Sequence, residues 1–179
     1  MATPDTAADL ATPSFDRPVR ILLVVAPFHR VIADGLLAGA RAVLDEAGVR
    51  HETIEVPGAL EIPTAIALGA RSGNYYDGFI ALGCVIRGET THYETVANDS
   101  SRGLTLLGLK GICIGNGILT VENKPQATVR ADPAGEDKGG GAAKAALHLI
   151  ALARRFAPPS RPLPDGSFRI ADASGGERA

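Results

Sequence analysis

Aromatic side chains are scarce in this sequence. The chain of 179 residues contains no tryptophan, 5 phenylalanines and 3 tyrosines. An aromatic residue near the end of a predicted strand is therefore a candidate for stacking on a ligand. Charge of one sign is also lacking, since the formal net charge is −2. Such a chain offers no basic face for nucleic acid or for an anionic membrane surface, so any anion site must be local.

Cysteine and long apolar runs are equally scarce, which excludes further classes. The 2 cysteines, Cys84 and Cys113, form no CxxC pair and no cluster with histidine, so a zinc site is not expected. No apolar run is long enough to cross a membrane, and the polar N-terminus does not resemble a signal peptide. A GxGxxG fingerprint after the first strand, a GxSxG elbow and a carboxylate cluster for a metal are also missing. We expect a cytoplasmic protein with reduced thiols.

Short apolar segments typical of buried strands alternate with segments of helical periodicity. The strand pattern occurs at residues 21–26, 51–56, 79–82 and 111–117, and a helical segment follows each one. A last helix is predicted from Lys138 to Arg155. Alternating strands and helices indicate right-handed crossovers and a parallel sheet. The expected fold class is α/β: a three-layer α/β/α sandwich with a central four-stranded parallel sheet, similar to flavodoxin.

The two ends of the chain lack this pattern. Residues 1–19 are rich in Ala, Thr, Pro and Asp, and residues 157–179 in Pro, Gly and Ser. Segments of such composition bury too little apolar surface to offset the entropy of ordering. We therefore expect one domain at residues 20–156, a flexible N-terminal arm and a flexible C-terminal tail.

Parallel strands end at one edge of a sheet, where open α/β folds bind their ligands. The loops predicted there are residues 27–29, 57–61, 87–92 and 115–117. His92 lies at the start of a predicted helix, for which Thr91 and Glu94 have the capping-box spacing. The N–H groups of residues 89–93 would favour an anion, and an imidazole at the positive end of a helix stays available as a base.

Each candidate also has a structural interpretation. A lone histidine such as His92 is often only a solvated or capping residue, and His29, His51 and His148 show no metal-ligand spacing.

The other candidates have two interpretations as well. Arg130 and Lys138 flank a glycine-rich helix start, which suits phosphate binding but lacks P-loop spacing and is equally typical of a charged surface. Phe28 can stack on a ligand or belong to the core, and Glu61 can bind a ligand or cap its helix. These residues alone predict a histidine-bearing anion crevice and leave the reaction open.

Five motifs in a fixed order are more specific. They are Pro27-Phe28, VPGALEIP at residues 56–63, GCVIRGETTHYE at residues 83–94, GNGILTVEN at residues 115–123, and Arg130 with Lys138 before the glycine-rich helix start. In this combination the chain closely resembles the lumazine synthase family over residues 20–156. The resemblance implies a transferase that condenses 5-amino-6-(D-ribitylamino)uracil with 3,4-dihydroxy-2-butanone 4-phosphate. The products would be 6,7-dimethyl-8-ribityllumazine, phosphate and water, in the penultimate step of riboflavin synthesis, with no metal or redox cofactor.

The resemblance also implies roles for individual residues. His92 would transfer protons, and Phe28 would stack on the pyrimidine. Glu89 and Thr90 would hold the phosphate through backbone amides, with Arg130, and Lys138 would add charge nearby. The remaining residues implied for the pyrimidine and its ribityl chain are Ala59, Leu60, Glu61, Cys84, Val85, Ile86 and Asn116.

In this family each site lies between adjacent subunits of a pentamer. Asn116, Arg130 and Lys138 would therefore reach the site of a neighbouring subunit. The sequence leaves open whether pentamers stay single, pair into decamers or form a shell of sixty subunits, and riboflavin synthase is a further candidate partner. Two positions depart from the family pattern. His29 stands where asparagine is expected, and Asn116 stands where some members carry a phenylalanine that could stack on the ring.

Two other classes of function remain open at this point. A non-catalytic flavin- or lumazine-binding assembly protein would share the fold, but the joint presence of His92, Arg130 and Lys138 favours the enzyme. An electron carrier of the flavodoxin type would share the fold as well, and it would contain bound flavin.

Overall fold

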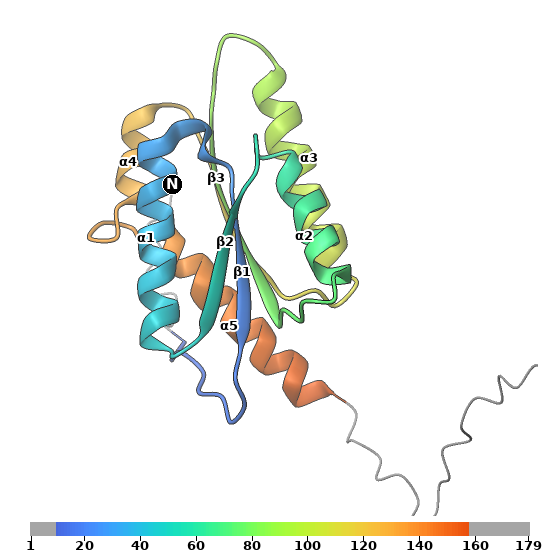
Figure 1. Ribbon diagram of the computed structural model, residues 1–179. Coiled ribbons are helices and arrows are strands. Elements are labelled where there is room, and N and C mark those ends of the chain that lie inside the picture. The colour runs from blue at the N-terminus through green and yellow to red at the C-terminus, as the bar shows by residue number, and fades with distance from the viewer. Residues whose placement is uncertain (1–9, 158–179) are drawn as a thin grey trace, which may run out of the picture.

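The computed structural model describes residues 10–157 and has four parallel strands at its centre (Figure 1). They are β1 (Arg20–Val25), β2 (Arg50–Glu55), β3 (Gly78–Ile86) and β4 (Ile114–Val121), in the order β2-β1-β3-β4. Since all three strand pairs are parallel, the four carboxyl ends lie toward one edge. The predicted α/β class, with a flavodoxin-like four-stranded parallel sheet, is confirmed.

Helices cover both faces of this sheet (Figure 1). One face carries α1 (Arg30–Glu46), α4 (Lys124–Ala131) and α5 (Lys138–Phe156), and the other carries α2 (Glu61–Arg71) and α3 (His92–Gly108). A single 3-10 turn, η1 (Pro27–His29), connects β1 to α1. Among residues 10–157, no helix has both the length and the apolar character that a membrane crossing needs.

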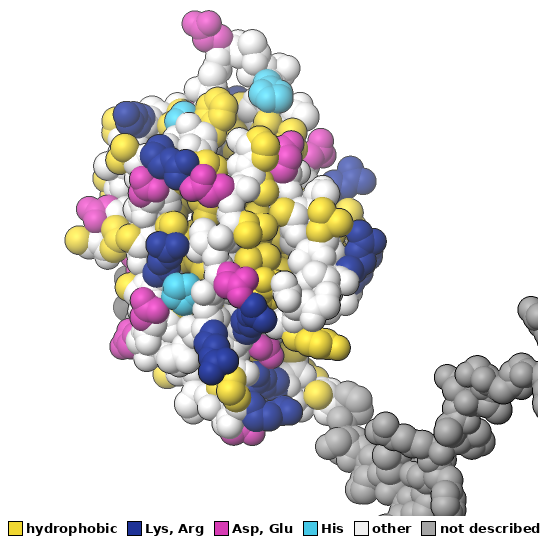
Figure 2. Space-filling view, in the orientation of Figure 1, with side chains coloured by type: hydrophobic (Ala, Val, Ile, Leu, Met, Phe, Trp, Pro, Cys, Tyr) yellow, Lys and Arg dark blue, Asp and Glu magenta, His cyan; other side chains and the backbone are white. Residues whose placement is uncertain are grey.

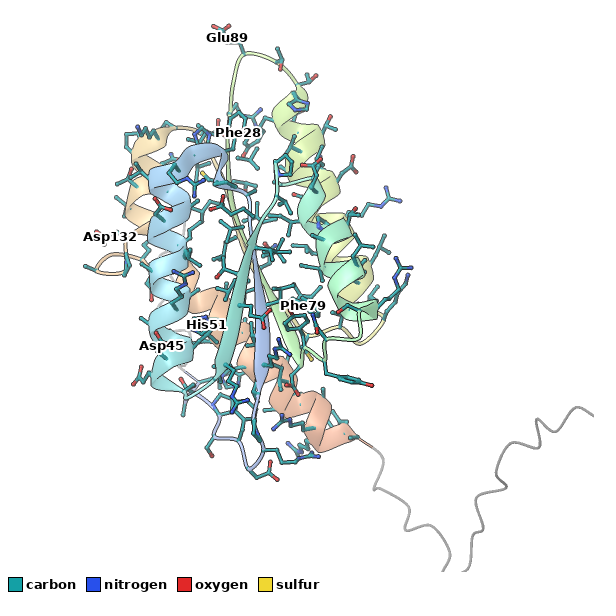
Figure 3. The ribbon with its side chains drawn as sticks, viewed as in Figure 1. Phe28, Asp45, His51, Phe79, Glu89 and Asp132 are labelled. Atoms are coloured by element: carbon teal, nitrogen blue, oxygen red, sulfur yellow. The ribbon has the colours of Figure 1, made fainter. Side chains whose placement is uncertain are left out.

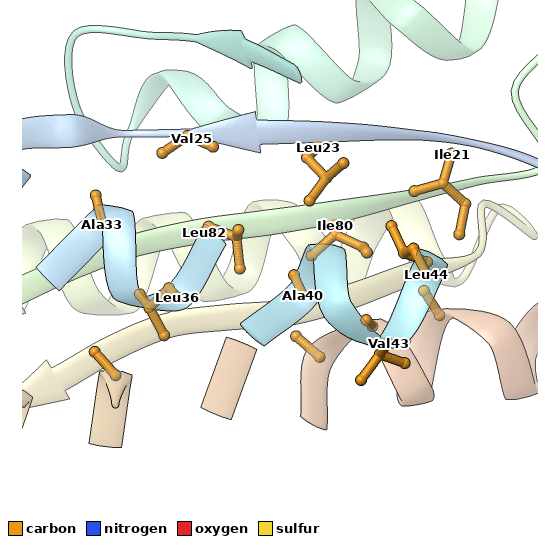
Figure 4. Close-up of a cluster of buried hydrophobic side chains, with 14 of the residues drawn as sticks. Ile21, Leu23, Val25, Ala33, Leu36, Ala40, Val43, Leu44, Ile80 and Leu82 are labelled. Atoms are coloured by element: carbon orange, nitrogen blue, oxygen red, sulfur yellow. The ribbon is translucent and has the colours of Figure 1, made fainter. Parts of the chain in front are cut away.

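The central strand β1 is apolar throughout because both of its faces are buried. Ile21, Leu23 and Val25 belong to the core cluster under α1 and α5, part of which Figure 4 shows. Leu22 and Val24 belong to the second cluster, on the side of α2. Successive side chains of a strand point to opposite faces, so a continuous apolar run fits a strand between two helical layers.

The fourth strand lies further along the chain than predicted. The sequence analysis placed a strand at residues 111–117 with its glycines at the carboxyl end, whereas β4 begins at Ile114 and continues to Val121. Gly115 and Gly117 are needed because other parts of the chain pack directly against the backbone of β4, and not because the chain turns there. A Cβ on Gly115 would overlap the carbonyl oxygen of Ala142 in α5, and one on Gly117 would lie 2.8 Å from Leu82 Cδ2. The expected loop at residues 115–117 is therefore wrong, and this segment is part of the sheet.

Helix ends follow the sequence signals in part. Asn123 caps α4 by accepting a hydrogen bond from the N–H of Gln126, and Gly48 follows α1 with a φ of 65°. The capping box at Thr91 and Glu94 is wrong. Thr91 has helical backbone angles and makes no side-chain cap, and the Glu94 carboxylate instead contacts Arg87 at 3.3 Å.

The predicted C-terminal tail lies outside the described residues except for Ala157, and residues 1–9 of the predicted N-terminal arm lie outside them as well. Within the described part, residues 10–19 run along α5 up to the start of β1. Arg154 of α5 donates to the carbonyl oxygens of Arg17 at 3.0 Å and Pro18 at 2.9 Å, and its guanidinium lies 5.1 Å from the Phe15 ring. These contacts connect the segment before β1 to the last helix.

The start of α5 provides a stability test with an internal control. A Cβ on Gly139 would overlap the backbone of Leu36 in α1, whereas a Cβ on Gly141 would meet nothing within 4 Å. We expect Gly139→Ala to lower the free energy of unfolding by about 1–3 kcal/mol, because two helix backbones must separate. Gly141→Ala should raise it by about 0.5–1 kcal/mol, since alanine is the better helix former. Urea unfolding at one fixed subunit concentration measures both, and equal effects of the two substitutions would contradict this helix contact.

Candidate active site

A cavity of about 400 Å³ lies at the edge where the strands end. Its wall combines η1, the loop after β2, the end of β3, the loop after β3 and the first turns of α3. The sequence-predicted site residues that line it are Phe28, Ala59, Leu60, Glu61, Cys84, Val85, Ile86, Thr90 and His92. The topology thus brings together three stretches that are far apart in the sequence, as expected from the meeting of strand ends.

Four predicted site residues do not line this cavity. Glu89 lies at the tip of the loop after β3, where its side chain points away from the protein (Figure 3). Arg130 donates to the carbonyl oxygen of Gln126 within α4, at 3.0 Å. Lys138 pairs with Glu136 at 3.2 Å. Asn116 lies on β4 and lines a second cavity of about 470 Å³ between α3 and α5.

Sequence reasoning passed over two aromatic lining residues. His29 was given no role in the site, although residues 27–29 were expected at this edge; it lines the cavity, with its ring 5.2 Å from that of Phe28 in an edge-on arrangement. Tyr93 follows His92 and also lines the cavity, with the Arg87 guanidinium 4.2 Å from its ring centroid. Since aromatics are scarce in this chain, Tyr93 could have been found from its place in the motif beside His92.

The loop after β3 leaves backbone donors available. Within the described residues, the N–H groups of Glu89, Thr90 and Thr91 have no hydrogen-bond partner, and that of His92 reaches only the Thr90 hydroxyl, at 3.4 Å. The 17-residue helix α3 begins directly behind them. Unpaired N–H groups and the positive end of a helix favour an anion at this point.

Glu61 and His92, two of the polar side chains that line the cavity, differ in how they are held. Glu61 begins α2, and a Cβ on Gly58 would lie 3.0 Å from its Oε2 atom, so the carboxylate lies close over the loop. His92 is exposed, and within the described residues its ring makes no hydrogen bond. A ring held this loosely can accept or donate a proton to a bound molecule. No group of His, Cys, Asp or Glu among residues 10–157 is arranged to hold a metal ion.

Apolar burial and mixed surface charge surround the cavity. Cys84 is 6 % exposed at its floor, and burial raises the pKa of its thiol to about 11. Burial, followed by the charge of Asp77, also raises the pKa of Cys113. Buried cysteines such as Cys84 behave as small apolar residues.

On the face seen in Figure 2, acidic and basic side chains are interspersed beside a seam of hydrophobic ones.

Similarity to known proteins decides the family. Residues 18–154 match the family described as 6,7-dimethyl-8-ribityllumazine synthase. A protein of that name from Jannaschia sp. (strain CCS1) is 58% identical over 169 residues, which cover 93% of this chain and 94% of the relative. The protein of the same name from Novosphingobium aromaticivorans is 58% identical over 137 residues, covering 76% of this chain and 98% of the relative. The chain belongs to the 6,7-dimethyl-8-ribityllumazine synthase family. The family resemblance stated from the five motifs is confirmed.

Membership of the lumazine synthase family makes the chain an enzyme. The matched residues 18–154 include every element from β1 almost to the end of α5. All five motifs therefore lie inside the matched region, and so does the whole cavity wall.

Thiol reactivity tests the cavity floor. Because burial raises the pKa of Cys84 to about 11, only about one thiol in a thousand is ionised at pH 8, and the thiolate is the reactive form. We expect both cysteines of the folded protein to react with Ellman's reagent far more slowly than in urea, where 2 thiols per chain should react at once. Rapid reaction of one thiol in the folded protein would contradict the buried environment of Cys84 or Cys113.

Proposed function

We propose that this chain condenses 5-amino-6-(D-ribitylamino)uracil with 3,4-dihydroxy-2-butanone 4-phosphate, giving 6,7-dimethyl-8-ribityllumazine, phosphate and water. The observation that carries the proposal is the 58% identity, over almost the whole chain, to a protein named for this product. The reaction is the penultimate step of riboflavin synthesis. The cavity supports it, because one wall offers apolar and aromatic side chains and the other offers a histidine beside free amides.

The pyrimidine would bind against Phe28. This side chain is 78% exposed at the cavity mouth, which is unusual for phenylalanine and leaves a ring face available for stacking. The polar edge of the ring and the ribityl chain would contact the two strand ends and the helix start that form the floor. The residues proposed for these contacts are Ala59, Leu60, Glu61, Cys84, Val85 and Ile86.

The phosphate of the second substrate would bind at the start of α3. The free amides of Glu89 and Thr90 would donate hydrogen bonds to it, and the helix end would favour its charge. Among the described residues that line the cavity there is no lysine or arginine. Arg130 and Lys138 would therefore come from a neighbouring subunit, and Asn116 would approach from its position on the edge strand β4.

His92 would act as the proton-transfer residue. The amine of one substrate must attack the ketone of the other, lose water to form an imine, expel phosphate and close a second ring. Each of these steps moves a proton and none moves an electron between substrates and protein. A single imidazole near the phosphate site can serve them in turn, while the bound phosphate holds the substrate in place.

The proposed assembly is a homo-oligomer with sites shared between adjacent subunits. The family implies an oligomer, and we propose pentamers, with decamers and shells of sixty subunits as open alternatives. Contact with riboflavin synthase and a cytoplasmic location remain predictions from the sequence. The alternative of a non-catalytic flavin- or lumazine-binding protein gains no support, since the relatives carry the name of the synthase.

Replacing the proposed proton-transfer residue tests the reaction. We expect His92→Ala to lower kcat by roughly 10²–10⁴-fold without abolishing turnover, because positioning of both substrates remains. Lumazine absorbance, followed with both substrates present, measures the rate. His51→Ala is the matched control: His51 pairs with Asp45 at 3.0 Å far from the cavity, so its loss should leave kcat unchanged (Figure 3). Wild-type protein that forms no lumazine would refute the proposed function.

Mixed oligomers test whether sites are shared. His92→Ala and Arg130→Ala subunits should each be nearly inactive alone. When the two are unfolded together and reassembled in equal amounts, about a quarter of head-to-tail interfaces would combine an intact His92 with an intact Arg130. Activity should then rise well above that of either variant. If both residues serve the same subunit, no intact site forms and mixing has no effect.

A further inference from the structure

The side chain of Arg87 connects three parts of the site. Its own N–H donates to the carbonyl oxygen of Val121 at 2.9 Å, which extends the pairing of β3 with β4 by one residue. Its Nε lies 2.8 Å from Glu122, in the connection between β4 and α4. Its guanidinium also contacts Glu94 at 3.3 Å and faces the ring of Tyr93 at 4.2 Å. The arginine thus links the end of the sheet to the first turn of α3.

Apart from Arg87, the first turns of α3 are held by the partly buried side chains of Tyr93 and Val96, which pack against the apolar cluster on the α2 side of the sheet. The only fully buried residues of this helix are Ser100 and Leu104, both in its later turns. In the loop before it, residues 88–91 are all exposed, and none of their N–H groups bonds to the rest of the described chain. A segment with few buried apolar contacts opens easily. Within the described residues, the contacts of the Arg87 side chain are therefore the polar connection between this turn and the end of the sheet.

We propose that Arg87 is a positioning residue for the reaction. It holds the first turn of α3 so that His92 and the amides of Glu89 and Thr90 lie at a fixed separation from the strand ends. The phosphate-bearing substrate contacts both the amides and His92, so its binding and conversion depend on this separation. The pyrimidine substrate, which binds against Phe28 and the ends of β2 and β3, depends on it less. This inference rests on the proposed function.

Arginine suits this role better than lysine. Its planar guanidinium offers several N–H donors at fixed angles and a flat face for an aromatic ring, whereas an ammonium group is a point charge. In this structure the N–H groups of Arg87 donate to Glu94 and Glu122, and the flat face of its guanidinium lies over the ring of Tyr93. The side chain of Arg87 is 39% exposed and both carboxylates are over half exposed. Exposed pairs of this kind add little to stability, so their effect is on geometry.

The test compares steady-state kinetics of wild type, Arg87→Met and Arg87→Lys, with each substrate varied in turn. We expect Arg87→Met to lower kcat/KM for the phosphate-bearing ketone by about 10- to 100-fold, as small misplacements of reacting groups do. The KM for the pyrimidine amine should change by less than about twofold. Arg87→Lys should recover part of the loss. Wild-type kinetics in Arg87→Met, or an equal rise in KM for both substrates, would overturn the proposal.

Arg20 offers a matched control at the opposite edge of the sheet. It pairs with the carboxylate of Glu52 and lies 5.0 Å from the ring of Tyr76, so its surroundings resemble those of Arg87. Arg20→Met should lower the melting temperature as much as Arg87→Met does, yet leave both kcat/KM values unchanged. If Arg20→Met lowered kcat/KM as much as Arg87→Met does, Arg87 would act only on stability and not on the geometry of the site.

The double variant Arg87→Met/Glu94→Gln should lose no more activity than Arg87→Met, since both substitutions remove the same contact.

Binding of inorganic phosphate separates this inference from the proposed reaction. Calorimetry should give a dissociation constant about tenfold higher for oligomeric Arg87→Met than for wild type, because the amides are no longer held in place. Wild-type protein that binds phosphate but forms no lumazine would refute the reaction alone. Equal phosphate affinity in the two proteins would refute the role of Arg87, whatever the reaction.

Discussion

Burial of β1 and β3 on both faces is the constraint on which the rest of the structure depends. Eight of the nine residues of β3 are buried, so helices must cover the sheet on each side. Parallel strands joined by helices end at a common edge, where the helices no longer cover the backbone. Burial ends at this edge, since Ile86 is half-buried and the next residue, Arg87, is polar and exposed. The place of the cavity thus follows from the apolar runs, before any catalytic residue is considered.

The scaffold and the reactive groups are stabilised by different forces. Core residues such as Leu23 and Ile80 have no exposed surface, whereas His92 and Thr90 are exposed on a loop and a helix start. Within the described residues, the amides proposed to bind the phosphate are unpaired, so that segment gains no stability from hydrogen bonds of its own N–H groups. A rigid sheet beside a loosely held turn is the consequence, and polar contacts from Arg87 then set the geometry of the turn.

The fold could be predicted from periodicity, but the exact ends of elements could not. The apolar run at residues 79–82 lies within β3, and the run at residues 21–26 coincides with β1 except that β1 begins and ends one residue earlier, at Arg20 and Val25. The register of β4 was misjudged because Gly115 and Gly117 are also typical of turns. Their actual cause, close contact with α5 and with Leu82, is a tertiary effect that no local pattern contains. The spacing of Thr91 and Glu94 suited a capping box, but the Glu94 carboxylate pairs instead with Arg87, which lies outside the helix at the end of β3.

Nine of the predicted site residues meet in one chain because they lie at or just after the carboxyl ends of strands. Cys84, Val85 and Ile86, within β3, were predicted from the family resemblance alone. Arg130 and Lys138 do not meet them: α4 and the start of α5 lie on the other face of the sheet. Among residues 10–157, those that line the cavity offer free amides and Glu61 but no lysine or arginine, which balances poorly the charge of the phosphate that we propose to bind there. Under the proposed function, the charge balance of this site is completed by groups that the single chain places elsewhere. The proposed assembly, with α4 of one subunit beside the β3–α3 loop of the next, would supply them.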